Sequence, residues 1–303
     1  MYFSNLPRIS AILGIASIGL ISPTLPAFAQ DETHKETAEE AKLRVNLAGR
    51  QRMLTQRMTS AACFIELGID VHMHHDMLAE AHDLFVETNY ALSHGDEELG
   101  LFVERDPSVV VGLARIDRDW VQFAPLVEEI LAKDEGDTAG LEHINEIGLL
   151  MLRHADTVVH LIEDAHQRNL PHLSDVLART INLAGRQRMF TQRIAKDFCL
   201  IDSGFNVEAN MEHLADHQQY FNATLTALHD GFSGVLLPAP TDEIRIKLEE
   251  VAEVWQAPNA VITAVIGGAE ISDQDRHVIA LEMEHVLVTM DEAVKLYQEF
   301  NHD

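Results

Sequence analysis

The octapeptide NLAGRQRM occupies Asn46–Met53 and occurs again, unchanged, at Asn182–Met189. The match extends outward without a gap, because Val45–Arg57 and Ile181–Arg193 agree at 11 of 13 positions. Further pairs at the same offset of 136 residues are Cys63 with Cys199, Gly68 with Gly204, Phe85 with Phe221 and Gly95 with Gly231. Self-similarity at a fixed period is the signature of a duplicated structural unit. The chain therefore contains two copies of one domain.

Within each copy, apolar residues recur at helical spacing. The sequence predicts helices near 34–68, 72–94, 107–133 and 138–168, and again near 173–203, 207–230, 241–267 and 272–302. Pro125 and Pro258 fall inside the third helix of each copy, which we expect them to kink or interrupt. Four helices joined by short turns form an up-down-up-down bundle. We expect an all-α fold of two tandem antiparallel four-helix bundles that form a pseudo-dimer.

The amino terminus has the pattern of a cleaved secretory signal. Arg8 precedes an apolar run from Ile9 to Ile21, and Ala27-Phe28-Ala29 precedes Gln30. The run is shorter than the roughly 20 residues that a membrane-spanning helix needs. We therefore expect a signal peptide at 1–29 cleaved after Ala29, a first bundle at 30–168 and a second at 169–303. The mature protein is expected to be periplasmic and not membrane-spanning.

Charge is distributed unevenly along this acidic chain. It contains 49 acidic and 22 basic side chains, a net charge of −27, which argues against nucleic acid as a partner. Yet Ala41–Ile65 and Val176–Lys196 contain no Asp or Glu. Six arginines therefore have no acidic residue within their own stretch to pair with; they are Arg50, Arg52, Arg57, Arg186, Arg188 and Arg193. Their counter-charge comes from neighbouring helices, from solvent or from a bound anion.

Helical geometry places Arg52 on a narrow face of small and polar side chains. The face also includes Gly49, although a glycine inside a helix costs about 1 kcal/mol relative to alanine. Close approach of a second backbone would compensate for this cost. We therefore expect Gly49, and Gly185 in the second copy, to let another helix come near.

The octapeptide followed by TQR resembles the motif that opens PilJ-type and NarX-like periplasmic sensor domains, the amino-terminal domains of type IV pili methyl-accepting chemotaxis transducers. The resemblance covers both copies and implies four-helix bundles. In the nitrate and nitrite sensor kinases of this group, the first helices of two subunits meet, and one arginine from each grips a nitrate. The resemblance therefore implies that Arg52 and Arg188 bind an anion beside Gly49 and Gly185. Weaker ligand candidates are Asn46, Asn182, Arg50 and Arg186, and the two asparagines are expected to brace the start of their helices.

The sequence also departs from the kinases of this group. They have Ser-Leu between the glycine and the arginine, whereas this chain has Arg50-Gln51 and Arg186-Gln187, closer to the pilus-chemotaxis branch. Nitrate or nitrite is the expected ligand, bound at one shared site or at two separate ones. Members of the family usually carry membrane helices and an output domain, and we expect neither here. A separate membrane-bound sensor, chemoreceptor or transporter is then the expected protein partner.

Two cysteines occupy equivalent positions in the copies. If the two first helices pack in parallel, Cys63 and Cys199 can meet, and an oxidising periplasm permits a disulfide between them. The alternative is two separate, small, buried core residues. Sequence alone leaves both possibilities open.

Seventeen histidines raise the question of metal binding. Two groups have suitable spacing, but they do not repeat between the copies, so we expect no metal site; they are His72, His75, Asp76 and His82, and His213 with His217. No catalytic motif, phosphate loop or cofactor motif stands out. The main hypothesis is a non-enzymatic oxyanion sensor. The alternatives are a ligand-free structural or interaction protein and a periplasmic metal carrier that uses His and Met.

Overall fold

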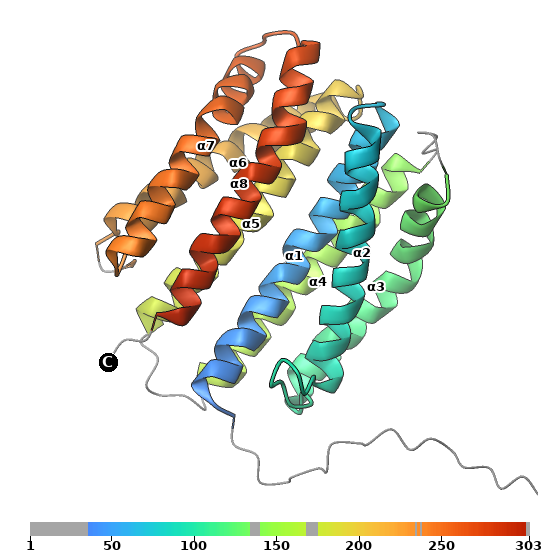
Figure 1. The fold of residues 1–303 in the computed structure, drawn as a ribbon. Coiled ribbons are helices and arrows are strands. Elements are labelled where there is room, and N and C mark those ends of the chain that lie inside the picture. The colour runs from blue at the N-terminus through green and yellow to red at the C-terminus, as the bar shows by residue number, and fades with distance from the viewer. Residues whose placement is uncertain (1–35, 134–139, 168–174, 234, 237, 301–303) are drawn as a thin grey trace, which may run out of the picture. The chain divides into compact units, whose positions relative to one another are not determined.

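The computed structural model describes residues 36–133, 140–167, 175–233, 235–236 and 238–300 (Figure 1). The expected signal peptide at 1–29 and the linker between the copies lie outside these ranges. The described residues form eight helices: α1 (Ala38–Glu66), α2 (Val71–His94), α3 (Pro107–Leu131), α4 (Leu141–Gln167), α5 (Asp175–Asp202), α6 (Val207–Asp230), α7 (Asp242–Ile266) and α8 (Asp273–Glu299). These bounds agree closely with those expected from the apolar spacing.

The helices form two tandem four-helix bundles. In the first, α1 packs against α2 and α4, and α3 packs against α2 and α4. In the second, α5 packs against α6 and α8, and α7 packs against the same two helices. One further extensive contact joins α1 to α5, which lie side by side in Figure 1. The all-α pseudo-dimer expected from the sequence is confirmed.

Local sequence signals explain where several helices begin and end. Thr37 caps α1, and Ser272 and Asp275 form a reciprocal capping box at the start of α8. Gly95 and Gly231 end α2 and α6 with φ angles of 80° and 81°, a backbone conformation that glycine adopts without strain. The two copies therefore share their turn chemistry as well as their helices.

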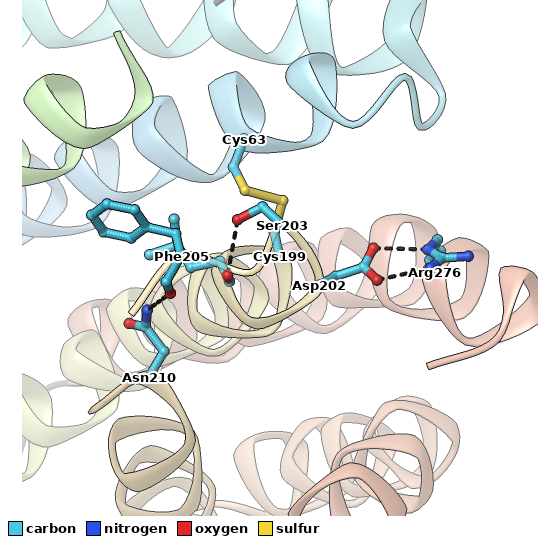
Figure 2. The surroundings of a disulfide bond; sticks show 8 residues. Cys63, Cys199, Asp202, Ser203, Phe205, Asn210 and Arg276 are labelled. Carbon is cyan, nitrogen blue, oxygen red and sulfur yellow. Dashed lines mark hydrogen bonds and ion pairs between the residues drawn. A yellow bond between two sulfur atoms is a disulfide. The ribbon is translucent and has the colours of Figure 1, made fainter. Parts of the chain in front are cut away.

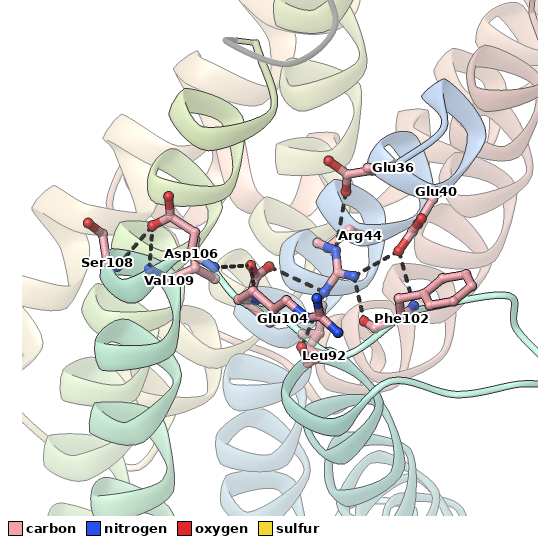
Figure 3. Close-up of polar contacts among 10 residues, drawn as sticks. Glu36, Glu40, Arg44, Leu92, Phe102, Glu104, Asp106, Ser108 and Val109 are labelled. Atoms are coloured by element: carbon pink, nitrogen blue, oxygen red, sulfur yellow. Dashed lines mark hydrogen bonds and ion pairs between the residues drawn. The ribbon is translucent and has the colours of Figure 1, made fainter. Parts of the chain in front are cut away.

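A buried arginine fastens the loop between α2 and α3 to α1 (Figure 3). Arg44 donates from Nη1 to the carbonyl oxygen of Leu92 at 3.3 Å and from Nη2 to that of Phe102 at 2.7 Å. It also pairs with Glu40 at 3.0 Å and with Glu104 at 3.3 Å. Glu36 is a third partner, with its Oε1 3.6 Å from Nε of Arg44, so three carboxylates balance the charge of this buried cation.

Pro125 and Pro258 lie inside α3 and α7, as the sequence predicts, but they do not end these helices. Helices α3 and α7 continue through Pro125 and Pro258, so neither residue interrupts its helix. Buried apolar side chains flank each proline and hold the helix on either side of the missing hydrogen bond; they are Phe123 and Val127 in α3, and Trp255 and Ile262 in α7. No helix in the described part of the chain combines the length and hydrophobicity that a membrane crossing requires.

Candidate functional site

The contact between α1 and α5 brings the two octapeptides together. A disulfide joins Cys63 of α1 to Cys199 of α5, with a Cα–Cα distance of 6.2 Å (Figure 2). Nearer the other end of the same contact, Asn46 of α1 bonds to Arg188 of α5. Because residues of the two octapeptides meet at one end and equivalent cysteines at the other, the two helices run parallel and in register. Of the two possibilities that the sequence left open for the cysteines, the structure contains the disulfide.

Arg52 lies inside this contact and is 1% exposed. Its Nη1 donates to Oδ1 of Asp156, on α4 of its own bundle, at 2.8 Å. Its Nη2 donates to Oδ1 of Asn182, on α5 of the other bundle, at 2.9 Å. The guanidinium group therefore bridges the two bundles.

Arg188 repeats this arrangement from the opposite side and is also 1% exposed. Its Nη1 donates to Oδ1 of Asp291, on α8, at 2.5 Å, and its Nη2 donates to Oδ1 of Asn46, on α1, at 2.7 Å. Each arginine thus takes a carboxylate from its own bundle and an asparagine from the other. Asn182 bonds to Arg52 and Asn46 bonds to Arg188, and this reciprocal pairing is the pseudo-twofold relation that the duplication predicts.

The asparagines have a different role from the one expected. Asn46 and Asn182 lie well inside α1 and α5, not at their starts. Their side chains cross the interface, so they hold the opposite arginine and do not brace a helix terminus. A one-dimensional motif cannot reveal this, because the contact exists only after the two copies pack together.

Both arginines reach the same glycine. A Cβ atom placed on Gly49 would lie 3.4 Å from Nη2 of Arg52 and 3.9 Å from Nη2 of Arg188. A Cβ on Gly185 would lie 3.6 Å from Nη2 of Arg188. The expectation that these glycines admit a second backbone was wrong, because their nearest neighbours are guanidinium groups. The space that a side chain would occupy is taken by the arginine tips.

Two outer arginines add positive charge. Nη2 of Arg186 donates to Oδ1 of Asp156 at 3.2 Å and lies 3.3 Å from Nε2 of His160. The charge of Arg50, the equivalent residue of the first copy, lowers the pKa of Arg188 and of Asp291. The two arginines among the weaker ligand candidates, Arg50 and Arg186, therefore flank Arg52 and Arg188.

Burial is the largest influence on the charges of the central pair. It lowers the pKa of Arg52 and of Arg188, and the paired carboxylates oppose this shift. The charges of Arg50 and Arg52 lower the pKa of Arg188 further, so the cations repel one another. Guanidinium groups nevertheless stay protonated in proteins. The site holds several buried positive charges in an otherwise acidic molecule.

The carboxylates of the site were missed by the sequence argument. Burial by itself raises the pKa of Asp156 and of Asp291, but the adjacent arginines hold both values below the ordinary range. The two aspartates lie about a hundred residues from the arginines they pair with, so no local spacing indicates the contact. One signal was available: Asp156 and Asp291 occupy equivalent positions in the two fourth helices.

A second buried polar cluster belongs to the second bundle alone. Nζ of Lys196 donates to Oε1 of Gln56 across the interface at 3.1 Å and lies 3.5 Å from Oδ1 of Asp197. Oδ2 of Asp197 contacts Nδ1 of His217 at 2.6 Å. The first copy has Ser60 in place of Lys196, so this cluster breaks the symmetry of the interface.

The histidine groups do not assemble into a metal site in the part of the chain that the structure describes. No group of three or more His, Cys, Asp or Glu side chains there has an arrangement suited to a metal ion. His213 and His217 stack with ring centroids 6.0 Å apart, and His217 is engaged by Asp197.

The structure defines a duplicated four-helix bundle whose two copies meet through paired, arginine-bearing helices. A family model described as "PilJ: Type IV pili methyl-accepting chemotaxis transducer N-term" matches residues 36–145 and 173–281, one segment in each bundle. The chain belongs to this family. The comparisons with curated proteins and with solved structures gave no match.

Proposed function

We propose that this protein is a periplasmic sensor module that binds one small oxyanion, nitrate or nitrite, between Arg52 and Arg188. The observation that carries the proposal is the convergence of both Nη2 atoms on Gly49, at 3.4 and 3.9 Å from its built Cβ position. Guanidinium groups match planar oxyanions because their parallel N–H groups donate to two oxygens at once. A single anion between them also relieves their mutual repulsion.

The surrounding contacts support this assignment. Each aspartate holds the Nη1 side of its arginine, which leaves the Nη2 side directed at the interface. There the amide oxygens of Asn46 and Asn182 accept hydrogen bonds in the positions that oxyanion oxygens would take. The Nε atoms of Arg52 and Arg188 are buried and, among the described residues, have no hydrogen-bond partner. Such unsatisfied donors favour an additional acceptor.

The size of the ligand limits its affinity. Four heavy atoms gain at best about −1.5 kcal/mol each, or roughly −6 kcal/mol, which corresponds to a Kd of tens of micromolar. That range suits a sensor of ambient anion better than a scavenger. The acidic exterior slows the approach of an anion, which is acceptable for a slowly changing signal.

Isothermal titration with nitrate, nitrite and chloride tests the proposal. We expect saturable heat with nitrate or nitrite and at least about tenfold weaker binding in the double variant Arg52→Lys with Arg188→Lys. Lysine keeps the charge but loses the forked geometry. Arg245→Lys, at an exposed arginine of α7, is the matched control and is expected to bind as the natural protein does.

Two results would contradict the proposal. One is the absence of heat with all three anions, together with an unchanged melting temperature in nitrate compared with chloride at equal ionic strength. The other is full nitrate binding by a double lysine variant whose circular dichroism shows that it is folded.

We further propose that the module signals to a separate membrane-bound sensor, chemoreceptor or transporter. The signal-like sequence at 1–29, the family match and the lack of a membrane-spanning helix among the described residues support this arrangement. Fractionation of cells that produce the chain tests the location. Recovery with the cytoplasmic fraction, with residues 1–29 still attached, would contradict it.

A ligand-free interaction protein is the second candidate, and one observation favours it. Arg52 and Arg188 already have carboxylate partners, so the interface is charge-paired without an anion. This function predicts that Arg52→Ala leaves partner binding intact and that nitrate has no effect on it.

A further inference from the structure

A small groove opens between α2 and α3 of the first bundle, away from the α1–α5 interface. Its volume is about 170 Å³, and it is lined by Phe85, Val86, Asn89, Tyr90, Ser93, His94, Asp117 and Trp120. A cavity of about 150 Å³ is large enough for a benzene ring. The groove therefore has room for one small organic molecule.

Aromatic rings make up part of the groove's lining. Trp120 stacks on the buried ring of Phe85, with centroids 4.4 Å apart. Tyr90 stacks on His94 with centroids 4.3 Å apart, and Tyr90 is largely exposed. Aromatic faces of this kind attract cations through the negative potential above the ring.

Two acceptors lie next to each other in the groove, the amide oxygen of Asn89 and the carboxylate of Asp117. Asn89 is only 8% exposed, and its Nδ2 donates to Oδ1 of Asp117 at 2.7 Å. The Oδ1 atom of Asn89 is buried and has no hydrogen-bond partner within the described residues. A buried acceptor beside a carboxylate needs a donor, and a charged N–H donor satisfies both groups.

The second bundle provides an internal comparison. There Trp255 takes the place of Trp120, and its indole N–H donates to Oδ1 of Asn222 at 2.7 Å. Asn222 is the equivalent of Val86, so in the first bundle the indole N–H of Trp120 has no such acceptor in the described chain. Three further groove residues also differ, although Phe85 is retained as Phe221: Asn89 is replaced by Leu225, Tyr90 by Thr226 and Asp117 by Ala252. The bundle fold therefore does not require the groove's chemistry.

We propose that this groove binds a small primary amine that carries a short aryl or alkyl group. The ammonium donates to Oδ1 of Asn89 and to the Asp117 carboxylate, while the apolar part lies against Trp120. The net charge of −27 favours the approach of a cation. This site is separate from the proposed anion site and does not depend on it.

Nuclear magnetic resonance of the two tryptophan indole N–H groups tests the inference in the full chain. Benzylamine is the probe, and benzyl alcohol is its neutral counterpart of similar shape. We expect benzylamine to shift the Trp120 indole signal saturably and to leave the Trp255 signal in place. Benzyl alcohol is expected to bind at least about tenfold more weakly, because it lacks the charge that strengthens the hydrogen bonds.

Substitutions taken from the second bundle complete the test. Asp117→Ala and Asn89→Leu install residues found at equivalent positions, so folding is expected to be preserved. Each is expected to weaken benzylamine binding at least about tenfold. Glu253→Ala, at an exposed carboxylate of α7, is the charge-matched control and is expected to bind normally.

Three results would overturn the assignment. These are no saturable shift of the Trp120 signal, equal affinity for benzyl alcohol and benzylamine, or unchanged binding in Asp117→Ala.

Discussion

His74 is a buried imidazole without a polar partner. It is 1% exposed and stacks on Phe64 at a centroid distance of 4.6 Å, and neither ring nitrogen has a hydrogen bond to a described residue. Burial lowers its pKa from 6.5 to about 4, partly opposed by Asp70. Below pH 6.5 the unfolded chain binds a proton that the folded chain excludes. Stability is therefore present above pH 6.5 and is lost as the pH falls toward 4.

His74→Asn is expected to remove this pH dependence, because the equivalent Asn210 bonds to the carbonyl oxygen of Phe205 in the second bundle. The natural protein should lose on the order of 3 kcal/mol more than the variant between pH 7 and pH 4. Urea unfolding at both pH values measures the difference, and carboxylates that titrate in the same range cancel in the comparison. Equal losses in the two proteins would show that His74 is not the responsible group.

Asn46→Asp is expected to abolish anion binding without lowering the melting temperature. The new carboxylate would lie where the amide oxygen now accepts from Nη2 of Arg188, at 2.7 Å, and would occupy the proposed anion position permanently. Positive charge from Arg50 and Arg52 compensates for its burial. Nitrate titration and thermal unfolding measure both effects, with Asn259→Asp on α7 as the control. An undiminished nitrate response would remove Arg188 from the proposed site.

At this scale the sequence predicted the central residues better than their partners. The repeated motif indicated that Arg52 and Arg188 would meet, and the structure brings them to one glycine. The motif itself does not point to Asp156 and Asp291, because α4 and α8 reach the site only through the bundle topology. Of the three sources of counter-charge that the sequence left open, neighbouring helices supply a carboxylate to each arginine.

Among the elements, helix positions followed from apolar spacing, turn glycines and capping residues. The helical pattern places Pro125 and Pro258 inside α3 and α7, and tertiary packing decides that the helices continue through them. The low helix propensity of proline is a weak constraint where the helical turns on both sides of it are buried. Interruption at a proline is thus the one element-level expectation that the structure does not support.

The disulfide between α1 and α5 is expected to stabilise the pair of bundles. It closes a loop with a sequence separation of 136 residues, and loss of such a bridge typically costs about 2–5 kcal/mol. Cys63→Ser with Cys199→Ser should therefore unfold at lower urea concentration than the oxidised protein. A reductant should shift the natural protein toward the variant and leave the variant unchanged. Identical midpoints for oxidised protein and variant would contradict the expectation.

Gly148 of α4 lies directly against α1, where its carbonyl oxygen accepts from Nε2 of Gln56 at 3.2 Å. A Cβ there would lie 2.5 Å from Oγ1 of Thr59, whose hydroxyl donates to the carbonyl oxygen of Thr55 and cannot easily move. We expect Gly148→Ala to destabilise the protein by about 1–3 kcal/mol through overpacking. Gly49→Ala is the matched control, since its new methyl group would lie at ordinary contact distances of 3.4 and 3.9 Å from the arginine tips, and its stability should be equal or higher. Thermal unfolding decides, and equal midpoints for the two variants would contradict this account.

For the molecule as a whole, the duplication predicted the meeting of equivalent helices. It could not predict the asymmetric cluster of Lys196, Asp197 and His217, because a charged group in one copy and Ser60 in the other look like ordinary surface variation in sequence. Burial at the interface becomes visible only when α1 and α5 are placed together.

A chain cut between the bundles is expected to remain one folded unit. A protease site introduced at 168–172 and cleaved in the folded protein should give one band on a non-reducing gel and two bands after reduction, because Cys63 and Cys199 join the halves. The reduced halves should still elute together in gel filtration, held by the remaining contact between α1 and α5. Separate elution of the reduced halves would instead support the 30–168 and 169–303 segments as independent domains. Loss of helical circular dichroism on cutting would contradict the expectation that the cut chain stays folded.

The crosswise contacts of Asn46 with Arg188 and of Asn182 with Arg52 have a consequence for the history of the gene. After duplication, two copies are usually free to diverge, and one can decay while the other retains the ancestral task. Here a substitution in either octapeptide disturbs an arginine encoded by the other. We therefore expect the two motifs to be under joint selection; they are identical in this chain, whereas positions outside the shared contact, such as Asp117 and Ala252, differ between the copies.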